Sequence, residues 1–310
     1  MRSQPLSVAA TPAVRPAPQK SLPVTAIEKG QSDIGISATN DAYDLFVAGN
    51  YAYVADFGGG LRIYDVSWPG SPFEIGSYTQ ASRVRSLFVS GNLAYLAADS
   101  DGLRIVDVSN PFAPVEVGHL GTPAGAFNID VSNGVAYVAT YGRGLRLIDV
   151  TDPTHPAEIG SYDHSDYAWD VYVASGKAYL AAGPQGLKIV DVSNPAAPFY
   201  LGGSDTPGYA TGVHVSNQLA YVTDYDAGLR VIDVSNPARP EEKGYYDTLA
   251  YAWNVYVRNS VAYVASGSQG LYVLQYVAPP PTPTPTDTPV QTAPGYLEGQ
   301  VTDANGNPLA

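Results

Sequence analysis

A unit that recurs at a constant interval along the chain constrains the fold more than any other feature of the sequence. It is easiest to follow in the segment GLRIVDVSNP (102–111), which returns in near copies. The Gly-Leu pair that opens this segment stands at Gly60, Gly102, Gly144, Gly186, Gly228 and Gly270. A fixed period of about 42 residues indicates a repeat protein, in which each repeat buries its apolar surface against its neighbours.

Each repeat contains short segments with the pattern of β-strands. In the fourth repeat they span residues 169–175, 177–182, 186–192 and 198–204, are rich in Val, Ile, Leu and Tyr, and are bounded by Gly, Asn, Pro or Ser. A tight hairpin is expected between the first two, and an SNPxxP turn between the last two. The aspartate before that turn is predicted to accept hydrogen bonds from backbone amides of the turn. It recurs as Asp65, Asp107, Asp149, Asp191 and Asp233.

The two ends of the repeat region decide between a linear array and a ring. The sixth repeat has only three strand segments, at 251–257, 261–265 and 270–276, before the chain enters YVAPPPTPTP. The missing segment is found near the other end, where IEKG (27–30) matches EEKG (241–244). The sequence therefore predicts an all-β fold, a six-bladed β-propeller of four-stranded repeats. In this ring the N-terminal strand completes the last blade and removes an exposed sheet edge.

The flanking segments have compositions of their own. Residues 1–23 are rich in Pro and Ala and are predicted to be a disordered lead, before a propeller over 24–277. Residues 278–295 form a Pro/Thr-rich linker, which is expected to be an extended spacer. Residues 296–310 read as the truncated start of a further β module, with a hairpin signal at Asn305-Gly306. We therefore expect a monomeric propeller within a longer multidomain chain.

Charge and composition exclude several kinds of partner. The 16 basic and 29 acidic residues give a net charge of −13, which repels phosphate backbones, so nucleic acid is not expected as a partner. No cysteine is present, which excludes disulfides and thiolate metal sites. No segment approaches the roughly 18 apolar residues of a membrane span. Prolines interrupt the opening segment 1–19, so no signal peptide is visible there.

The run GLRIVDVSNPFAPVEVG, with AYVA before it, resembles the LVIVD-repeat family over about residues 27–277. That resemblance implies a propeller of bacteria or archaea that is secreted or displayed on the cell surface, and it implies no particular reaction. Together with the Pro/Thr-rich linker, it leads us to expect an extracellular or cell-surface location. The segment 296–310 is similar to the opening of a carboxypeptidase-regulatory-like or immunoglobulin-type module.

Motifs that carry chemistry are missing from the sequence. It has no phosphate-binding loop, nucleophile elbow, dinucleotide fingerprint or His-Glu-x-x-His motif, so no catalytic residue, cofactor or metal is predicted. His119 and His155 are expected at the outer rim and His214 between blades. His164 is assigned to a polar loop in preference to a metal site. The segment DSDG (99–102) lacks the remaining ligand positions of a calcium loop.

Differences between the repeats point to one face of the ring. A nearly invariant small residue at 42, 84, 126, 168, 210 and 252 is followed by two variable positions, and the loops between the second and third strands vary as well. In a propeller both features lie at the mouth of the central channel. Their Tyr, Trp, Arg and Asp residues are types that anchor protein interfaces and stack on sugars. The predicted ligand-binding residues are Tyr43, Asp44, Arg85, Phe127, Tyr167, Trp169, Asp170, Tyr209, Tyr251, Trp253 and Asn254.

Three functions are compatible with this pattern. The first is a non-catalytic module that binds a protein or carbohydrate partner on the mouth face. The second is a glycan hydrolase or lyase that uses Asp44, Asp56 and Asp170, which would need two carboxylates close together with one raised pKa. The third is a purely structural repeat, in which the aromatic residues only fill gaps between blades.

Overall fold

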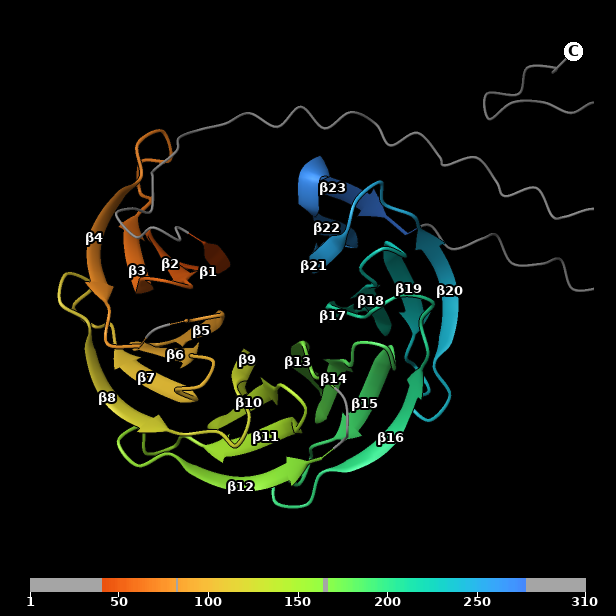
Figure 1. Cartoon of the computed structure of the whole chain (residues 1–310), viewed down its shortest axis with the longest axis horizontal. Coiled ribbons are helices and arrows are strands. Elements are labelled where there is room, and N and C mark those ends of the chain that lie inside the picture. Colours follow the sequence, from red (N-terminus) through yellow and green to blue (C-terminus); the bar gives the residue numbers. More distant parts are fainter. Residues whose placement is uncertain (1–40, 82, 164–166, 277–310) are drawn as a thin grey trace, which may run out of the picture. The chain divides into compact units, whose positions relative to one another are not determined.

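The computed structural model describes residues 41–81, 83–163 and 167–276. Within them the chain forms six antiparallel sheets, which are arranged as blades around a central opening (Figure 1). Five sheets have four strands in sequence order, and the sixth has three, β21-β22-β23. The all-β propeller predicted from the sequence repeat is confirmed.

The strands recur in the same order in every blade. The innermost strands are β1 (Ala42–Ala48), β5 (Ser86–Ser90), β9 (Ala126–Ser132), β13 (Asp170–Ala174), β17 (Gly212–Ser216) and β21 (Ala252–Arg258). The second strands are β2 (Tyr51–Asp56), β6 (Leu93–Ala97), β10 (Val135–Thr140), β14 (Lys177–Ala181), β18 (Leu219–Thr223) and β22 (Val261–Ser266). The third strands are β3 (Gly60–Asp65), β7 (Leu103–Asp107), β11 (Gly144–Asp149), β15 (Leu187–Asp191), β19 (Leu229–Asp233) and β23 (Gly270–Gln275). The outer strands are β4 (Phe73–Tyr78), β8 (Val115–Leu120), β12 (Ala157–Tyr162), β16 (Phe199–Ser204) and β20 (Glu241–Tyr246), and a short 3-10 helix, η1 (Gly267–Gln269), precedes β23.

Two recurring residues explain why the repeat pattern is kept. Gly102 has φ +75°, and a Cβ atom there would lie 2.4 Å from the carbonyl oxygen of Leu120, so this position requires glycine. Asp107 accepts a hydrogen bond from the amide of Ser109 at 2.8 Å, and the equivalent aspartates of the other four turns do the same. Hydrogen bonds from the hydroxyl and the amide of the residue two positions further on lower the pKa of each of the five carboxyls. The predicted turn-stabilising role of the aspartates is confirmed.

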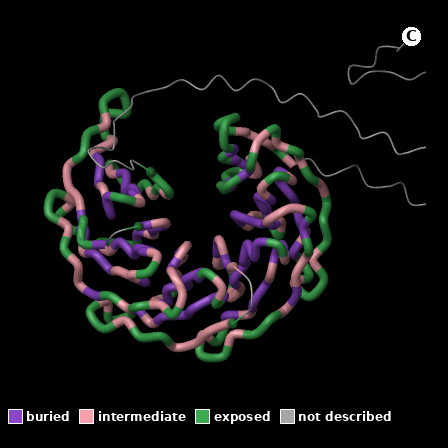
Figure 2. The backbone as a smooth tube through the Cα atoms, in the orientation of Figure 1, coloured by how far each residue is buried: buried purple, intermediate pink, exposed green. Residues whose placement is uncertain are grey.

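The hydrophobic core lies between the blades. Five clusters of buried side chains each combine residues of two consecutive blades. The first joins blades one and two, and the last joins blades five and six. Figure 2 shows the buried residues concentrated on the inner strands and the exposed ones on the outer turns. Because each strand alternates, one side of a blade packs on the preceding blade and the other on the following blade.

The outer strands are held by a close backbone contact with the next blade. A Cβ atom on Gly118 of β8 would lie 2.0 Å from the carbonyl oxygen of Pro153, which belongs to the SNP-type turn of the following blade. A Cβ atom on the equivalent glycines at 76, 160 and 202 would lie 2.1–2.4 Å from the carbonyl oxygen of the corresponding proline. The turn of each blade therefore lies against the backbone of its neighbour, and only glycine leaves room for it.

The facing surfaces of the first and sixth blades differ from the other interfaces. Leu45 and Val47 are 59% and 57% exposed, whereas the equivalent Leu87 and Val89 are 4% and 6% exposed. On the sixth blade Leu271 is likewise exposed, while the equivalent Leu229 is buried. The segment expected to complete the sixth blade (27–36) lies outside the described residues. So do the predicted lead (1–23), the linker (278–295) and the last module (296–310).

Candidate functional site

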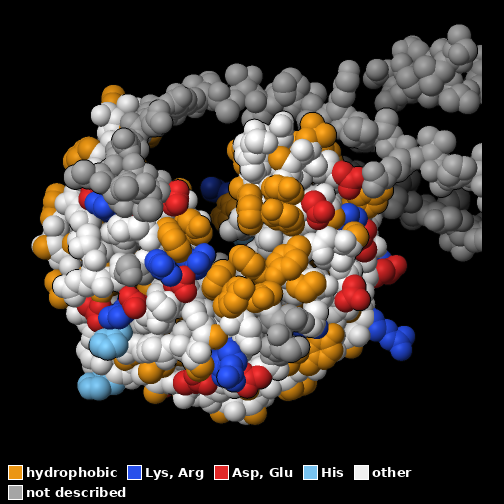
Figure 3. All heavy atoms as spheres, viewed as in Figure 1, with side chains coloured by type: hydrophobic (Ala, Val, Ile, Leu, Met, Phe, Trp, Pro, Cys, Tyr) orange, Lys and Arg blue, Asp and Glu red, His pale blue; other side chains and the backbone are white. Residues whose placement is uncertain are grey.

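A cavity of about 370 Å³ opens at the mouth of the central channel, and every blade contributes to its lining. Its main components are the six residues that we call the mouth column, the first variable position of each repeat: Tyr43, Arg85, Phe127, Trp169, Thr211 and Trp253. Ala42, Asn128, Asp170 and Asn254 complete the lining. In Figure 3 hydrophobic side chains gather around the central opening on this face. Seven of the eleven predicted ligand-binding residues line this cavity, and Asp44, Tyr167, Tyr209 and Tyr251 do not.

The local backbone explains why the mouth column points into the opening. At Tyr43, Phe127 and Trp253 the strand register shifts by one residue, as in a β-bulge, so each of these residues is left without a partner on the second strand. A bulge re-aims a side chain and bends the strand. These three residues thus leave the pleat of the sheet, and they line the cavity together with the rest of the mouth column.

The aromatic side chains on this part of the mouth face form a pair on blade one and a series on blades three and four. Tyr43 stacks on Phe57 with 4.9 Å between ring centroids, and Phe127 stacks on Tyr141 at 5.4 Å. Tyr141 contacts Tyr167 at 4.1 Å, so this series runs from blade three to blade four. A row of rings in contact restrains each side chain to one orientation.

Trp169 lies at the centre of this series. Its ring is close to perpendicular to Phe127 and Tyr209, with centroid distances of 5.1 Å and 5.8 Å. Its indole Nε1 donates a hydrogen bond to the hydroxyl of Tyr209 at 3.1 Å. Trp169 is half-buried, so it both packs between blades and faces the cavity.

Trp253 belongs to a second aromatic group on blades five and six. It is 46% exposed, and its ring lies 5.1 Å from that of Tyr225 with an interplanar angle of 75°. Tyr225 in turn stacks on Tyr251, with centroids 4.0 Å apart and planes within 3°. Of the two predicted indoles, Trp253 is the more accessible one at the cavity.

Arg85 is the only basic residue among those that line the cavity. Its guanidinium lies 4.2 Å from the ring centroid of Phe127 and 4.8 Å from that of Phe57. Nε and Nη2 both donate to one carboxylate oxygen of Asp99, at 3.2 Å and 3.0 Å. Two rings and one ion pair therefore hold the guanidinium at the edge of the cavity.

The second variable position of each repeat has mainly a structural role. The Asp44 carboxylate accepts the amide of Leu87 at 3.0 Å, and the Asp170 carboxylate accepts the amide of Val213 at 2.7 Å. Both bonds join one blade to the next. Burial raises the pKa of Asp170 to about 7 and also raises the pKa of Asp44. Of these two predicted ligand-binding residues, only Asp170 lines the cavity.

Three aromatic residues of this face were missed by the sequence analysis, namely Phe57, Tyr141 and Tyr225. All lie in the variable loops between second and third strands. Phe57 and Tyr141 each stack on the mouth-column residue of their own blade, at the offset of 14 residues that also relates Arg85 to Asp99. This recurring offset is the sequence signal that could have identified them.

The three carboxylates of the hydrolase hypothesis do not all line the cavity, although the charge of Asp44 adds to the effect of burial in raising the pKa of Asp170. Asp56 is completely buried and accepts the amides of Gly58 and Gly59, each at 3.0 Å. Its second oxygen lies 3.4 Å from Nε of Arg62. Asp170 is therefore the only one of the three proposed acids that lines the mouth.

The histidines and the candidate metal positions take ordinary structural roles where they are described. His119 and His155 are exposed and pair with Glu116 and Asp152. His214 lies between Tyr172 and Tyr256, and burial lowers its pKa to about 4. His164 lies outside the described residues. Within residues 41–81, 83–163 and 167–276, no group of three or more His, Asp or Glu side chains is arranged to hold a metal ion.

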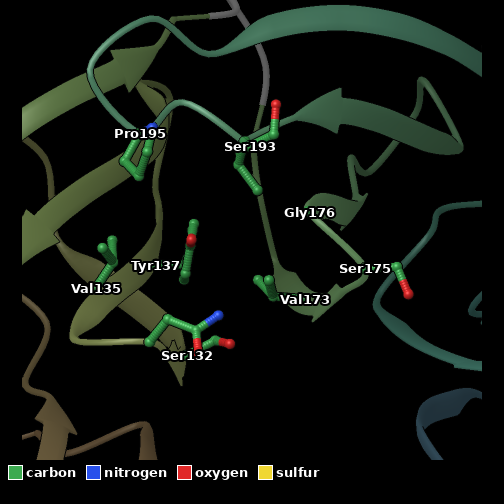
Figure 4. Close-up of a pocket in the computed structure, with 10 residues that line it drawn as sticks. Ser132, Val135, Tyr137, Val173, Ser175, Gly176, Ser193 and Pro195 are labelled. Carbon is green, nitrogen blue, oxygen red and sulfur yellow. The ribbon is translucent and has the colours of Figure 1, made fainter.

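A second cavity, of about 290 Å³, lies between blades three and four near the hairpin that joins β13 and β14. Figure 4 shows that small side chains such as Ser132, Ser175 and Ser193 surround it together with Tyr137 and Pro195. It lacks charged side chains in its lining. Nothing in its lining selects a ligand, and the mouth remains the candidate site.

The fold and the mouth cavity define a β-propeller, and comparison with known proteins agrees. A functionally unknown protein from Desulfotomaculum acetoxidans superposes with a TM-score of 0.64 at 13% identity, covering 76% of this chain and 82% of that chain. The Neurospora crassa Pan2 WD40 domain superposes with a TM-score of 0.59 at 14% identity, and the match covers 75% of this chain and 74% of that chain. The computationally designed Ika8 protein superposes with a TM-score of 0.59 at 11% identity, and the match covers 76% of this chain and 71% of that chain. At these identities the likeness shows the fold alone.

The family model of the LVIVD repeat matches residues 40–80, 81–122, 124–164, 165–206 and 207–248. The chain belongs to the LVIVD-repeat family. No curated protein matches it in sequence. In the part of the chain that the structure describes, no helix is long and apolar enough to cross a membrane.

Proposed function

We propose that this propeller is a non-catalytic carbohydrate-binding module, and that its ligand occupies the cavity at the mouth. The observation that carries the proposal is the mouth column. The one position that varies most in chemistry between otherwise similar repeats supplies one residue per blade to a single cavity. The ring would bring any equivalent position of the blades together, but a purely structural repeat has no need of chemically different side chains at that position.

The composition of the lining favours a sugar over a flat protein partner. Tyr43, Phe127, Trp169 and Trp253 offer aromatic faces, while the amides of Asn128 and Asn254 offer donors in the same cavity. Small-molecule sites combine a mainly apolar wall with a few placed polar groups in a concave space of this size. Binding of a folded protein would instead draw on an extended, flat surface.

The polar residues support binding without turnover. Each carboxylate oxygen of Asp170 accepts a backbone amide, from Val213 at 2.7 Å and from Val171 at 2.9 Å. A carboxyl group fixed in this way holds the blades together. The proposal also fits the extracellular setting expected from the sequence, where polymeric sugars are the accessible ligands.

Titration calorimetry with a panel of soluble neutral, amino-sugar and uronic-acid oligosaccharides tests the proposal. Trp253→Ala should weaken binding roughly thirtyfold, about 2 kcal/mol, with little change in melting temperature because Trp253 is half exposed. The matched control is Trp68→Ala, since Trp68 is 74% exposed in the turn between β3 and β4. Unchanged affinity of the Trp253 variant, or binding of a protein partner and no oligosaccharide, would overturn the proposal.

A further inference from the structure

Arg85 distinguishes the mouth from a simple aromatic platform. The chain as a whole carries a net charge of −13, yet the only ionic group of the lining besides Asp170 is a guanidinium. Asp99 occupies its Nε and Nη2 atoms, and Nη1 has no hydrogen-bond partner among the described residues. An Arg edge that remains free suits a planar carboxylate.

A second guanidinium strengthens the positive character of this part of the mouth. Arg83 is exposed, and its Cζ atom lies 5.9 Å from the ring centroid of Phe57, which also contacts Arg85. Arg83 has no ion pair within the described residues, so Asp99 balances only one of the two positive charges. Two guanidinium groups therefore lie beside Phe57, and within the described residues only that of Arg85 is paired with a carboxylate.

The guanidinium of Arg85 lies close to the aromatic side chains of Phe127 and Trp169. Phe127 contacts both groups, because the Arg85 guanidinium lies 4.2 Å and the Trp169 ring 5.1 Å from its centroid. These separations are on the scale of one sugar ring. A pyranose that stacks on Trp169 can thus place a ring substituent beside Arg85, with the side-chain nitrogen of Asn128 as a further donor in the lining.

From this geometry we infer that the ligand is an acidic sugar, a uronic acid whose carboxylate binds Arg85 while its ring stacks on Trp169. The inference rests on the proposed function and names its substrate class. The negatively charged remainder of the protein surface then limits binding of acidic polymers to this one location.

The test uses one oligogalacturonate and the same oligosaccharide after chemical reduction of its carboxyl groups. Wild-type protein should bind the acidic probe at least about ten times more tightly than the reduced probe. Added salt should reduce this ratio of affinities, because it screens the charge of Arg85. Arg85→Gln should abolish the preference, so that this variant binds the two probes with equal affinity. The matched control is Arg258→Gln, which removes an exposed charge at the opposite end of β21 from Trp253.

A second variant does not depend on loss of function. Asp99→Asn removes the carboxylate that competes for Arg85, so it should tighten binding of the acidic probe about threefold or more without affecting the reduced probe. Equal affinity of wild-type protein for the two probes, with both lost in Trp253→Ala, would overturn this inference and leave the proposed function standing. If neither probe nor any other oligosaccharide binds, both are overturned.

Discussion

The carboxylate of Asp170 accepts a hydrogen bond at 2.7 Å from the backbone amide of Val213, which lies 43 residues further along the chain in the next blade. The same offset of one repeat plus one residue relates Asp44 to Leu87 and Asp130 to Val173. These side chains therefore connect consecutive blades around the channel. A buried carboxyl that is used in this way makes stability depend on pH.

We predict that Asp170→Asn changes the pH dependence of stability. Burial raises the pKa of Asp170 from 3.8 to about 7. Between these values the folded state binds more protons than the unfolded state, so the free energy of unfolding of the wild type falls as pH rises and levels off above about 7. The penalty at pH 8 is about 4 kcal/mol, and the variant lacks it. Relative to wild type, the variant should therefore gain stability from pH 4 to pH 8.

Urea unfolding of both proteins at pH 4, 6 and 8 measures this difference. Asp107→Asn is the control, because hydrogen bonds from Ser109 lower the pKa of Asp107 from its ordinary value of 3.8. Its favourable contribution is lost only as pH falls below that value, so the difference in stability between this variant and wild type should stay nearly constant from pH 4 to pH 8. Parallel stability curves for wild type and Asp170→Asn would show that the carboxyl is not buried in solution.

The close contact at Gly118 predicts that Gly118→Ala is destabilising. The added Cβ atom would lie 2.0 Å from the carbonyl oxygen of Pro153, so the turn of the next blade must move. Overpacking of this kind costs about 1–3 kcal/mol. Gly121→Ala is the matched control, since no atom lies within 4 Å of the position of its Cβ. Thermal melting of both variants decides the matter, and equal melting temperatures would contradict the contact.

The first and sixth blades are expected to pack against each other through the surfaces that are exposed in the described residues. Leu45 is 59% exposed, but its equivalent in the second blade, Leu87, is buried against the preceding blade. We predict that Leu45→Ser and Leu87→Ser each cost about 2–4 kcal/mol. Chemical denaturation measures both. A cost for Leu45→Ser below about 0.5 kcal/mol would show that this face stays in solvent.

Removal of residues 1–36 should cost most of the stability of the ring. Within the described residues β23 has no strand on its outer side, and the sequence match of IEKG to EEKG assigns that strand to this segment. A strand that buries on the order of 300 Å² contributes about 7 kcal/mol, which is comparable to the stability of a whole domain. As a control, removal of residues 278–310 should leave the melting temperature within about two degrees. An unchanged unfolding midpoint after the N-terminal deletion would contradict the assignment.

The sequence alone was sufficient to predict the blades and part of the lining of the mouth cavity. Strand alternation and turn residues are local properties, so the fourth repeat places β13 to β16 within a residue of the predicted segments. The mouth column was found because its variation contrasts with the constant positions around it. The stacking partners Phe57, Tyr141 and Tyr225 lie in loops of variable sequence, where only their common offset of 14 residues from the mouth column marks them. The pKa of Asp170 depends on burial by neighbouring blades, which a one-dimensional pattern does not contain.

The short sequence separation between contacting blades has a consequence for how the ring assembles. Contacts such as that of Asp170 with Val213 form as soon as one further repeat has been synthesised, so each new blade can dock on the preceding one. A contact between the first and sixth blades spans about five repeats, and its loop-closure entropy is larger by about 1–2 kcal/mol. The join between the chain ends is therefore the last contact to form and the first to open. Native-state hydrogen exchange should be slowest in the inner strands of blades three and four, which stay packed on both sides when the ring opens.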